Sequence, residues 1–303
     1  MEFLNSHTLS LLGKSILLLA GARIWLSSLA RSPRHSEQQV KLPFSYPDDF
    51  DALIESEIEQ RTDNFQVEGA RAWTRSKSCG GQSRDFFEIR ESARNTVNFY
   101  LGDVAGKGVP ATLYQVSCVS LLRQASSISV EPTGVVSEVN RTLTEREMDG
   151  RHATLVYGTL DLSSGRLRLL SAGHPQPIRL SRDGSVEVLD GTVCLPLGAV
   201  AEHKYVHTEY HLDPGDTLLL YSDGITATRN RKRETFGARS LLRSLPQHDV
   251  SSPKALVDRI FEEVSDFGST HNQEQTVMAV TYTGLTSEFD TNKLTPCSQS
   301  IPC

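Results

Sequence analysis

Short apolar runs separated by turn residues dominate the chain from Phe65 onward, and they limit the folds that it can adopt. Each run is rich in β-branched or aromatic residues and short, which predicts a β-strand. The predicted strands are 65–73, 86–89, 97–101, 154–162, 167–171, 178–180, 186–189, 217–221 and 277–282. Ser163-Ser-Gly165 and Arg182-Asp-Gly-Ser185 are turn sequences, so they predict antiparallel hairpins.

Helical patterns interrupt the strands in only a few places, and there they come in pairs. Residues 109–124 and 133–147 form the first pair, and residues 238–245 and 253–267 form the second. Grouped helices among antiparallel strands predict an α+β fold. Its simplest form is a β-sandwich of two mainly antiparallel sheets flanked by helix pairs.

The composition is that of one ordinary globular domain with additional segments. The chain has 303 residues, of which 38% are hydrophobic and 22% are charged. Its formal net charge of -6 argues against a nucleic-acid partner, and basic residues cluster only locally, as in 229–233. The five cysteines include no CxxC pair, so the sequence predicts neither a zinc site nor a disulfide framework.

The N-terminal segment, residues 1–35, differs from the rest because it is apolar and basic, with no acidic residue from position 3 onward. The window 9–30 has about the 20 residues that a membrane span needs, provided that Lys14 and Arg23 extend to the interface. A membrane anchor with the following domain in the cytoplasm is one prediction. An interfacial helix, a transit-like peptide and a cleaved signal are the alternatives, and without an anchor we expect a cytoplasmic protein.

Three further parts follow the N-terminal segment. Residues 36–64 form a polar linker that contains Pro43 and Pro47 and ends in a short helix. Residues 65–284 form the sandwich domain, and residues 285–303 form a flexible tail rich in Ser and Thr.

The stretch LGDVAGKGVPAT at 101–112 looks like a nucleotide-binding P-loop, but its spacing does not fit. A P-loop needs Gly, four residues, Gly-Lys and then a hydroxyl residue, whereas Lys107 is followed by Gly108. Asp103 instead ends a predicted strand, and Asp223 follows another strand in the same way, each beside a glycine. Carboxylates at strand ends suit Mg²⁺ or Mn²⁺, although an Asp-Gly pair can equally form a simple turn.

Seven motifs in one order resemble those of PPM (PP2C-like) serine/threonine phosphatases of the bacterial stage-II-sporulation-E (SpoIIE/RsbU-type) branch, over about 67–284. The motifs are Gly80-Gly81 with 85–87, 102–111, 153–158, 172–175, 195–198, 221–226 and 234–237. The resemblance implies a two-metal phosphatase built on the predicted sandwich, with Mn²⁺ or Mg²⁺ as the ions.

The resemblance also implies roles for particular residues. Asp103 would bridge both ions with help from the backbone carbonyl of Val104, and Asp223 would bind one ion. These two aspartates would then be catalytic through a metal-activated water molecule. His174 in the Ala-Gly-His turn would either fix the turn or touch substrate, and the structural role is the commoner one for a histidine.

Two departures from the family pattern affect the metal site. Gln82 stands where the family usually has the aspartate of Gly-Gly-Asp, and Gln273 stands at the first position of its Asp-Asp-x-Thr motif. An amide oxygen can bind a hard cation but brings no charge, so we expect weaker metal binding. Glu274 and Asp85 are alternative ligands, although side-chain alternation along a strand makes either replacement imperfect.

Two functions follow from these motifs and departures. The first is a metal-dependent phosphatase that hydrolyses phosphoserine or phosphothreonine in a regulatory protein, such as an anti-sigma-factor antagonist. The second is a catalytically degenerate pseudophosphatase, a regulatory module that keeps the fold and binds the phosphoprotein without hydrolysing it. The two lost carboxylates are the reason for the second.

Overall fold

The computed structural model describes residues 60–78, 84–92, 95–145, 150–245, 252–268 and 274–285. Several predictions concern residues outside these ranges: the N-terminal segment with its window 9–30, the linker up to 59, Gly80, Gly81, Gln82, Gln273 and the tail from 286 onward. No helix in the described ranges is both long enough and apolar enough to span a membrane.

Within the described ranges, twelve strands form two six-stranded sheets. The first sheet has the order β1 (Gln60–Val67), β2 (Ala70–Lys77), β12 (Gln275–Tyr282), β11 (Thr217–Tyr221), β7 (Ile178–Leu180) and β8 (Val186–Val188). The second has the order β10 (Thr208–His211), β6 (Arg166–Ala172), β5 (Ala153–Asp161), β4 (Thr96–Val104) and β3 (Asp85–Ser92), with β9 (Val193–Cys194) beside β6. Only the β6–β9 pair is parallel, so both sheets are mainly antiparallel, as predicted.

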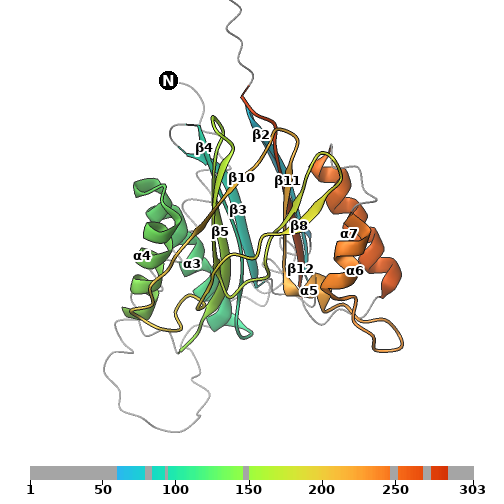
Figure 1. Ribbon diagram of the computed structural model, residues 1–303. Helices are drawn as coiled ribbons and strands as arrows, with labels where there is room; N and C mark the ends of the chain where they lie inside the picture. The colour runs from blue at the N-terminus through green and yellow to red at the C-terminus, as the bar shows by residue number, and fades with distance from the viewer. Residues whose placement is uncertain are drawn as a thin grey trace, which may run out of the picture. The chain divides into compact units, whose positions relative to one another are not determined.

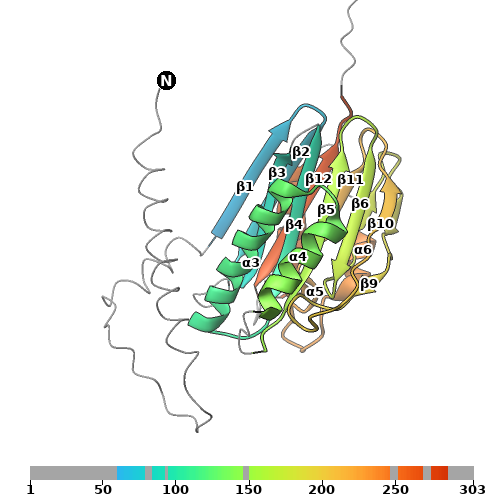
Figure 2. The ribbon, with the colours of Figure 1, turned by 90° about the vertical axis from the view of Figure 1, so that its left-hand side faces the viewer.

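Helices cover the outer face of each sheet (Figures 1 and 2). The second sheet carries α3 (Val109–Ile128) and α4 (Pro132–Glu145), and the first carries α6 (Gly237–Ser244) and α7 (Pro253–Phe267). A one-turn helix, α5 (Asp223–Thr226), follows β11 directly. The predicted α+β sandwich flanked by helix pairs is therefore confirmed.

Side-chain alternation along the strands divides the buried residues into three layers. On β4, Phe99 and Leu101 face the first sheet and pack with residues such as Leu218 and Met278. The intervening Tyr100 packs instead under α3 and α4. A third cluster lies between the first sheet and the helices α6 and α7. Because both faces of each sheet are covered, the central strands β11 and β12 are buried along their whole length.

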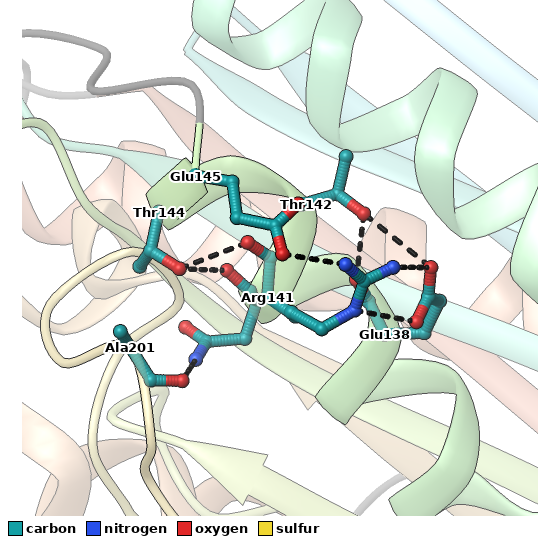
Figure 3. A network of polar contacts seen from close by, with 7 residues as sticks. Glu138, Arg141, Thr142, Thr144, Glu145 and Ala201 are labelled. Atoms are coloured by element: carbon teal, nitrogen blue, oxygen red, sulfur yellow. Dashed lines mark hydrogen bonds and ion pairs between the residues drawn. The ribbon is translucent and has the colours of Figure 1, made fainter.

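The exposed face of α4 carries ion pairs, while its inner face holds a loop in place. Arg141 pairs with Glu138 and Glu145 on the solvent side (Figure 3). Exposed pairs of this kind contribute little to stability. Asn140 is buried, donates to the carbonyls of Val200 and Ala201, and accepts from the Gly198 amide. The 195–201 loop is thereby fastened to α4.

The first part of the domain differs from the sequence prediction. The prediction of one strand over 65–73 is wrong, because Gly69 adopts a φ of 90° and reverses the chain between β1 and β2. The strand β1 begins at Gln60, earlier than the predicted domain start at Phe65. Both predicted hairpins are present, as the pairs β5–β6 and β7–β8.

Close packing at Gly158 on β5 gives a test of the sandwich interior. A Cβ atom at this position would lie 2.2 Å from the Phe99 ring and 2.9 Å from Leu169. We therefore expect Gly158→Ala to lower the free energy of unfolding by about 2 kcal/mol or more, measured by urea denaturation.

Gly134→Ala in α4 is the matched control, since an added Cβ there meets only the Ser129 hydroxyl, at 3.3 Å. Alanine also favours a helix over glycine by about 1 kcal/mol, so this variant should be at least as stable as the wild type. Equal destabilisation by the two substitutions would contradict the described packing of β5.

Candidate functional site

Asp103 and Asp85 face each other across the β3–β4 ladder. They are Cα partners in the antiparallel register, so their side chains project from the same face of the second sheet. That face is turned toward the first sheet, because Thr276 of β12 donates its hydroxyl to Asp85 Oδ2 at 2.6 Å. The two aspartates therefore lie between the sheets, at the end where β4 finishes and β3 begins.

Glu274, the residue before β12, ties the two sheets together at the same point. Its carboxylate accepts from the Ser76 hydroxyl at 2.9 Å and from the backbone amides of Arg84 and Asp85 at 2.6 and 2.9 Å. The side chain is only 5% exposed. Oε2 of Glu274 thus holds the start of β3, while Oε1 binds Ser76 on β2, and together they fix the backbone that carries Asp85.

Asp223 comes from the first sheet, at the first residue of α5. The preceding Ser222 accepts from the Thr276 amide at 2.9 Å and donates to the Glu274 carbonyl at 3.3 Å, so the end of β11 is held beside β12. Gly224 allows this approach, because a Cβ there would lie 1.8 Å from the Glu274 carbonyl oxygen. Asp223 itself is exposed to solvent.

The acidic groups affect one another electrostatically. Burial, together with the charges of Glu274 and Asp223 and opposed by the charge of Arg84, raises the pKa of Asp103 from 3.8 to about 6. Burial also raises the pKa of Asp85 well above 3.8, with further contributions from Glu274 and Asp103. The structure therefore brings Asp85, Glu274 and Asp223 within electrostatic reach of Asp103.

Arg84, the residue before β3, is a cationic group close enough to act on this cluster. Its charge lowers the pKa of Asp103, and its Nη1 donates to the Gly106 carbonyl at 3.3 Å. Gly106 and Gly108 both have positive φ, of 112° and 74°, in the loop between Asp103 and α3. The glycines of the LGDVAGKG stretch thus turn the chain sharply from β4 into α3.

His174 occupies a buried position between β6 and β7. It is 4% exposed, and its Nδ1 lies 3.0 Å from the Thr154 hydroxyl, which neighbours the Asp103 carbonyl at 3.5 Å. Its own carbonyl accepts from the Ser171 hydroxyl. These contacts suit a residue that fixes the turn behind Asp103.

The donor chemistry of the cluster suits a hard divalent cation. Asp103 Oδ1 is buried and lacks a hydrogen-bond partner among the described residues, which leaves a carboxylate oxygen available for a ligand. A cation would also relieve the repulsion between these like charges. The described ranges contain no preformed group of three or more His, Cys, Asp or Glu side chains arranged around one point.

Comparison with known proteins assigns the chain to a family. The family model described as Stage II sporulation protein E (SpoIIE) matches residues 93–282, more than half of the chain, so the chain belongs to this family. The predicted resemblance is thereby confirmed.

Two curated relatives illustrate the similarity. Phosphoserine phosphatase RsbU of Bacillus subtilis (strain 168) is 26% identical over 194 residues, which cover 62% of this chain and 55% of RsbU. Protein IcfG of Synechocystis sp. is 25% identical over 272 residues, which cover 80% of this chain and 40% of IcfG. The match thus spans about half of RsbU and two fifths of IcfG.

Solved structures share the fold. The RsbU and RsbW domains of Rv1364c from Mycobacterium tuberculosis superpose with a TM-score of 0.63 at 22% identity, covering 73% of this chain and 63% of that one. The PP2C phosphatase domain of SpoIIE from Bacillus subtilis, solved with a fragment of its regulatory domain, gives a TM-score of 0.61 at 21% identity, with coverages of 79% and 77%. The sandwich is therefore PP2C-like.

The buried His174 makes stability depend on pH. Burial lowers its pKa from 6.5 to about 3, so the folded protein keeps it neutral while the unfolded chain protonates it below about 6.5. The unfolded state then binds more protons as the pH falls, and stability decreases by about 1.4 kcal/mol for each pH unit well below 6.5. Denaturant unfolding at pH 7.5, 6.0 and 5.0 measures this dependence.

His174→Asn is the comparison, since an amide can meet the Thr154 hydroxyl and does not titrate in this range. The difference in unfolding free energy between wild type and variant should shrink as the pH falls from 7.5 to 5.0. A difference that stays constant over this range would show that His174 is not held neutral.

Proposed function

We propose that the chain is a metal-dependent protein serine/threonine phosphatase. The observation that carries the proposal is the pair Asp103 and Asp85 facing each other between the sheets, with the charge of Asp223 nearby. Membership of the SpoIIE family supports it, and the relative RsbU is named a phosphoserine phosphatase. The class of substrate would be a phosphorylated regulatory protein, such as an anti-sigma-factor antagonist.

Divalent cations, Mn²⁺ or Mg²⁺, would be held by the carboxylates. Asp103, Asp223 and Asp85 would supply side-chain oxygens, with the backbone carbonyl of Val104, and Gln82 and Gln273 are the remaining candidates. When bound, such ions lower the pKa of a water molecule and neutralise charge on a phosphoryl group. A solved relative in fold, RsbX, was crystallised in complex with magnesium.

The other residues of the site would position these groups. Glu274 would act through the backbone amides of Arg84 and Asp85 rather than as a ligand, because its Oε2 already accepts from these amides and its Oε1 from Ser76. Arg84 has a guanidinium group suited to phosphoryl oxygens, and it lies between the carboxylates and the glycine loop. We infer that Arg84 orients the phosphoryl group of the substrate.

A pseudophosphatase is the second candidate, and the neutral side chains of Gln82 and Gln273 favour it. Two divalent ions bring four positive charges, and each glutamine removes one negative charge from the expected ligand set. In this case the same surface would bind the phosphoprotein without hydrolysing it. A membrane anchor in the 9–30 window stays a prediction in either case.

Metal binding can be measured without any assay of activity. We expect saturating Mn²⁺ to raise the melting temperature of the wild type by about 5 °C, because a ligand at 100 times its Kd adds about 2.7 kcal/mol. Asp103→Asn should abolish most of this shift, whereas Asp266→Asn on the exposed face of α7 should leave it unchanged. The same shift in both variants would rule out Asp103 as the ligand.

Hydrolysis separates the two candidate functions. The full chain with millimolar Mn²⁺ should release phosphate from a phosphoserine peptide, and Asp103→Asn should reduce kcat by about a hundredfold or more, the scale of loss when electrostatic stabilisation is removed. A wild type that binds Mn²⁺ but releases no phosphate would identify a pseudophosphatase.

Restoring the family carboxylates tests the two glutamines. Gln82→Asp together with Gln273→Asp should increase both Mn²⁺ affinity and phosphate release, because each substitution returns one negative charge to the site. Titration calorimetry and the peptide assay measure the two effects. A folded double variant that gains neither would show that these positions are not part of the metal site.

A further inference from the structure

A short hairpin between α5 and α6 has a fixed conformation. It starts after Thr228 and closes before Phe236, whose amide donates to the Thr228 carbonyl at 2.9 Å. Within it, Asn230 Oδ1 accepts from the amides of Lys232 and Glu234 at 2.9 and 3.0 Å, and its Nδ2 donates to Glu234 Oε2 at 2.7 Å. These hydrogen bonds hold the hairpin in one conformation.

The hairpin concentrates positive charge in a chain whose net charge is -6. Arg229, Arg231, Lys232 and Arg233 are all exposed; we call residues 229–233 the basic loop. None of the four side chains is ion-paired within the part of the chain that the structure describes. Their charge is therefore available to a partner in solution.

Arg233 sits in a backbone conformation that does not favour it. Its φ is 64°, and the Arg233 amide donates to the Asn230 carbonyl at 2.9 Å, so it follows a turn at a position where hairpins prefer glycine or asparagine. The side chain is exposed, so packing does not require an arginine there. A residue that is unfavourable locally and turned to solvent points to a role in binding.

Hydrogen bonds join the base of the basic loop to residues that neighbour the carboxylate site. Thr228 donates to the Gly224 carbonyl at 2.8 Å, and Gln275 Nε2 donates to the Thr228 hydroxyl at 2.7 Å. Gly224 follows Asp223 in the chain, and Gln275 follows Glu274. Figures 1 and 2 show the loop between α5 and α6 at the same end of the sheets as α5.

We propose that the basic loop docks an acidic segment that flanks the phosphorylated residue of the substrate protein. The proposal rests on the proposed function, because it takes the molecule that reaches the carboxylate site to be a phosphoprotein. The cluster around Asp103 and Asp223 repels such an anionic segment, and the loop supplies compensating positive charge beside it.

An anionic membrane surface fits these observations less well. Attraction to lipid headgroups needs several basic residues spread over one face and falls off within a Debye length. The chain as a whole carries a formal net charge of -6, which opposes the approach of this face to such a surface. The acidic flank of the substrate is therefore the assigned partner.

Binding can be tested without metal and so without hydrolysis. The probes are a fluorescent phosphoserine peptide flanked by glutamates and the same peptide flanked by glutamines, titrated with the full chain at low salt. The wild type should bind the acidic peptide about tenfold more tightly, since three exposed ion pairs of about 0.5 kcal/mol each give that factor. Arg231→Gln with Lys232→Gln should remove most of the preference.

A charge-matched control distinguishes an effect of the loop on peptide binding from an effect of the protein's net charge. Arg71→Gln with Arg166→Gln also removes two positive charges, from exposed positions at the opposite end of the sheets. This control should keep the preference for the acidic peptide. Loss of the preference in both double variants, or in neither, would overturn the proposal.

Arg233→Gly gives a variant that cannot be dismissed as misfolded. Glycine suits the positive φ at this position, so the melting temperature should not fall below that of the wild type. The preference for the acidic peptide should nevertheless decrease by about twofold, the contribution of one exposed charge. An unchanged preference would show that Arg233 does not contact the peptide.

Two further measurements separate this proposal from its alternatives. With Mn²⁺ present, the loop variants should raise KM for the acidic peptide and leave kcat unchanged. If no peptide is hydrolysed, the proposed function fails while the binding titration still decides the docking. Binding of anionic phosphatidylserine vesicles that depends on Arg231 and Lys232, without any preference for the acidic peptide, would assign the loop to a membrane and overturn the proposal.

Discussion

The carboxylate of Glu274 is the contact on which the geometry of the site depends. It accepts hydrogen bonds from the backbone amides at the start of β3 and from Ser76 on β2, so it joins the two sheets where they meet the carboxylate cluster. The amides of Arg84 and Asp85 would otherwise be buried without a partner at this end of the sandwich. Satisfying them also sets the position of Asp85 opposite Asp103.

The carboxylate cluster costs the folded protein electrostatic free energy. Burial and like charges raise the pKa of both Asp85 and Asp103, which means that the ionised form of each is disfavoured in the folded protein. Hydrogen bonds from Thr276 and Ser222 offset part of this cost at Asp85. The concentrated charge of the cluster therefore lowers the stability of the folded protein, which is common at functional sites.

Much of the fold follows from local sequence patterns. The central strands β4, β5, β11 and β12 are predicted because burial on both faces makes them continuous apolar runs. The edge strand β10 alternates half-buried and exposed residues in a polar sequence, so it carries no comparable signal. The sequence predicts a single strand across Gly69, because the apolar and aromatic residues on its two sides form one run, whereas the chain reverses there.

The sequence predicts a site residue only where a local sequence pattern marks that residue. Asp103 and Asp223 stand out because each lies beside a glycine at a strand end, and the structure places them within electrostatic reach. The position of Asp85 opposite Asp103 depends on the β3–β4 register, which the sequence alone does not reveal. The contacts of Glu274 lie about 190 residues away in the chain, so its anchoring role has no local signature.

Strand pairing connects Gln60, where β1 begins, to the carboxylate cluster. Gln60 pairs with Lys77 of β2, and Lys77 in turn pairs with Gln275, the neighbour of Glu274. One cross-strand row, about 10 Å long at two strand spacings, therefore leads from the point where the chain enters the sandwich to the residue that anchors β3. The register of β1 is therefore connected, through two strand pairings, to the position of Glu274.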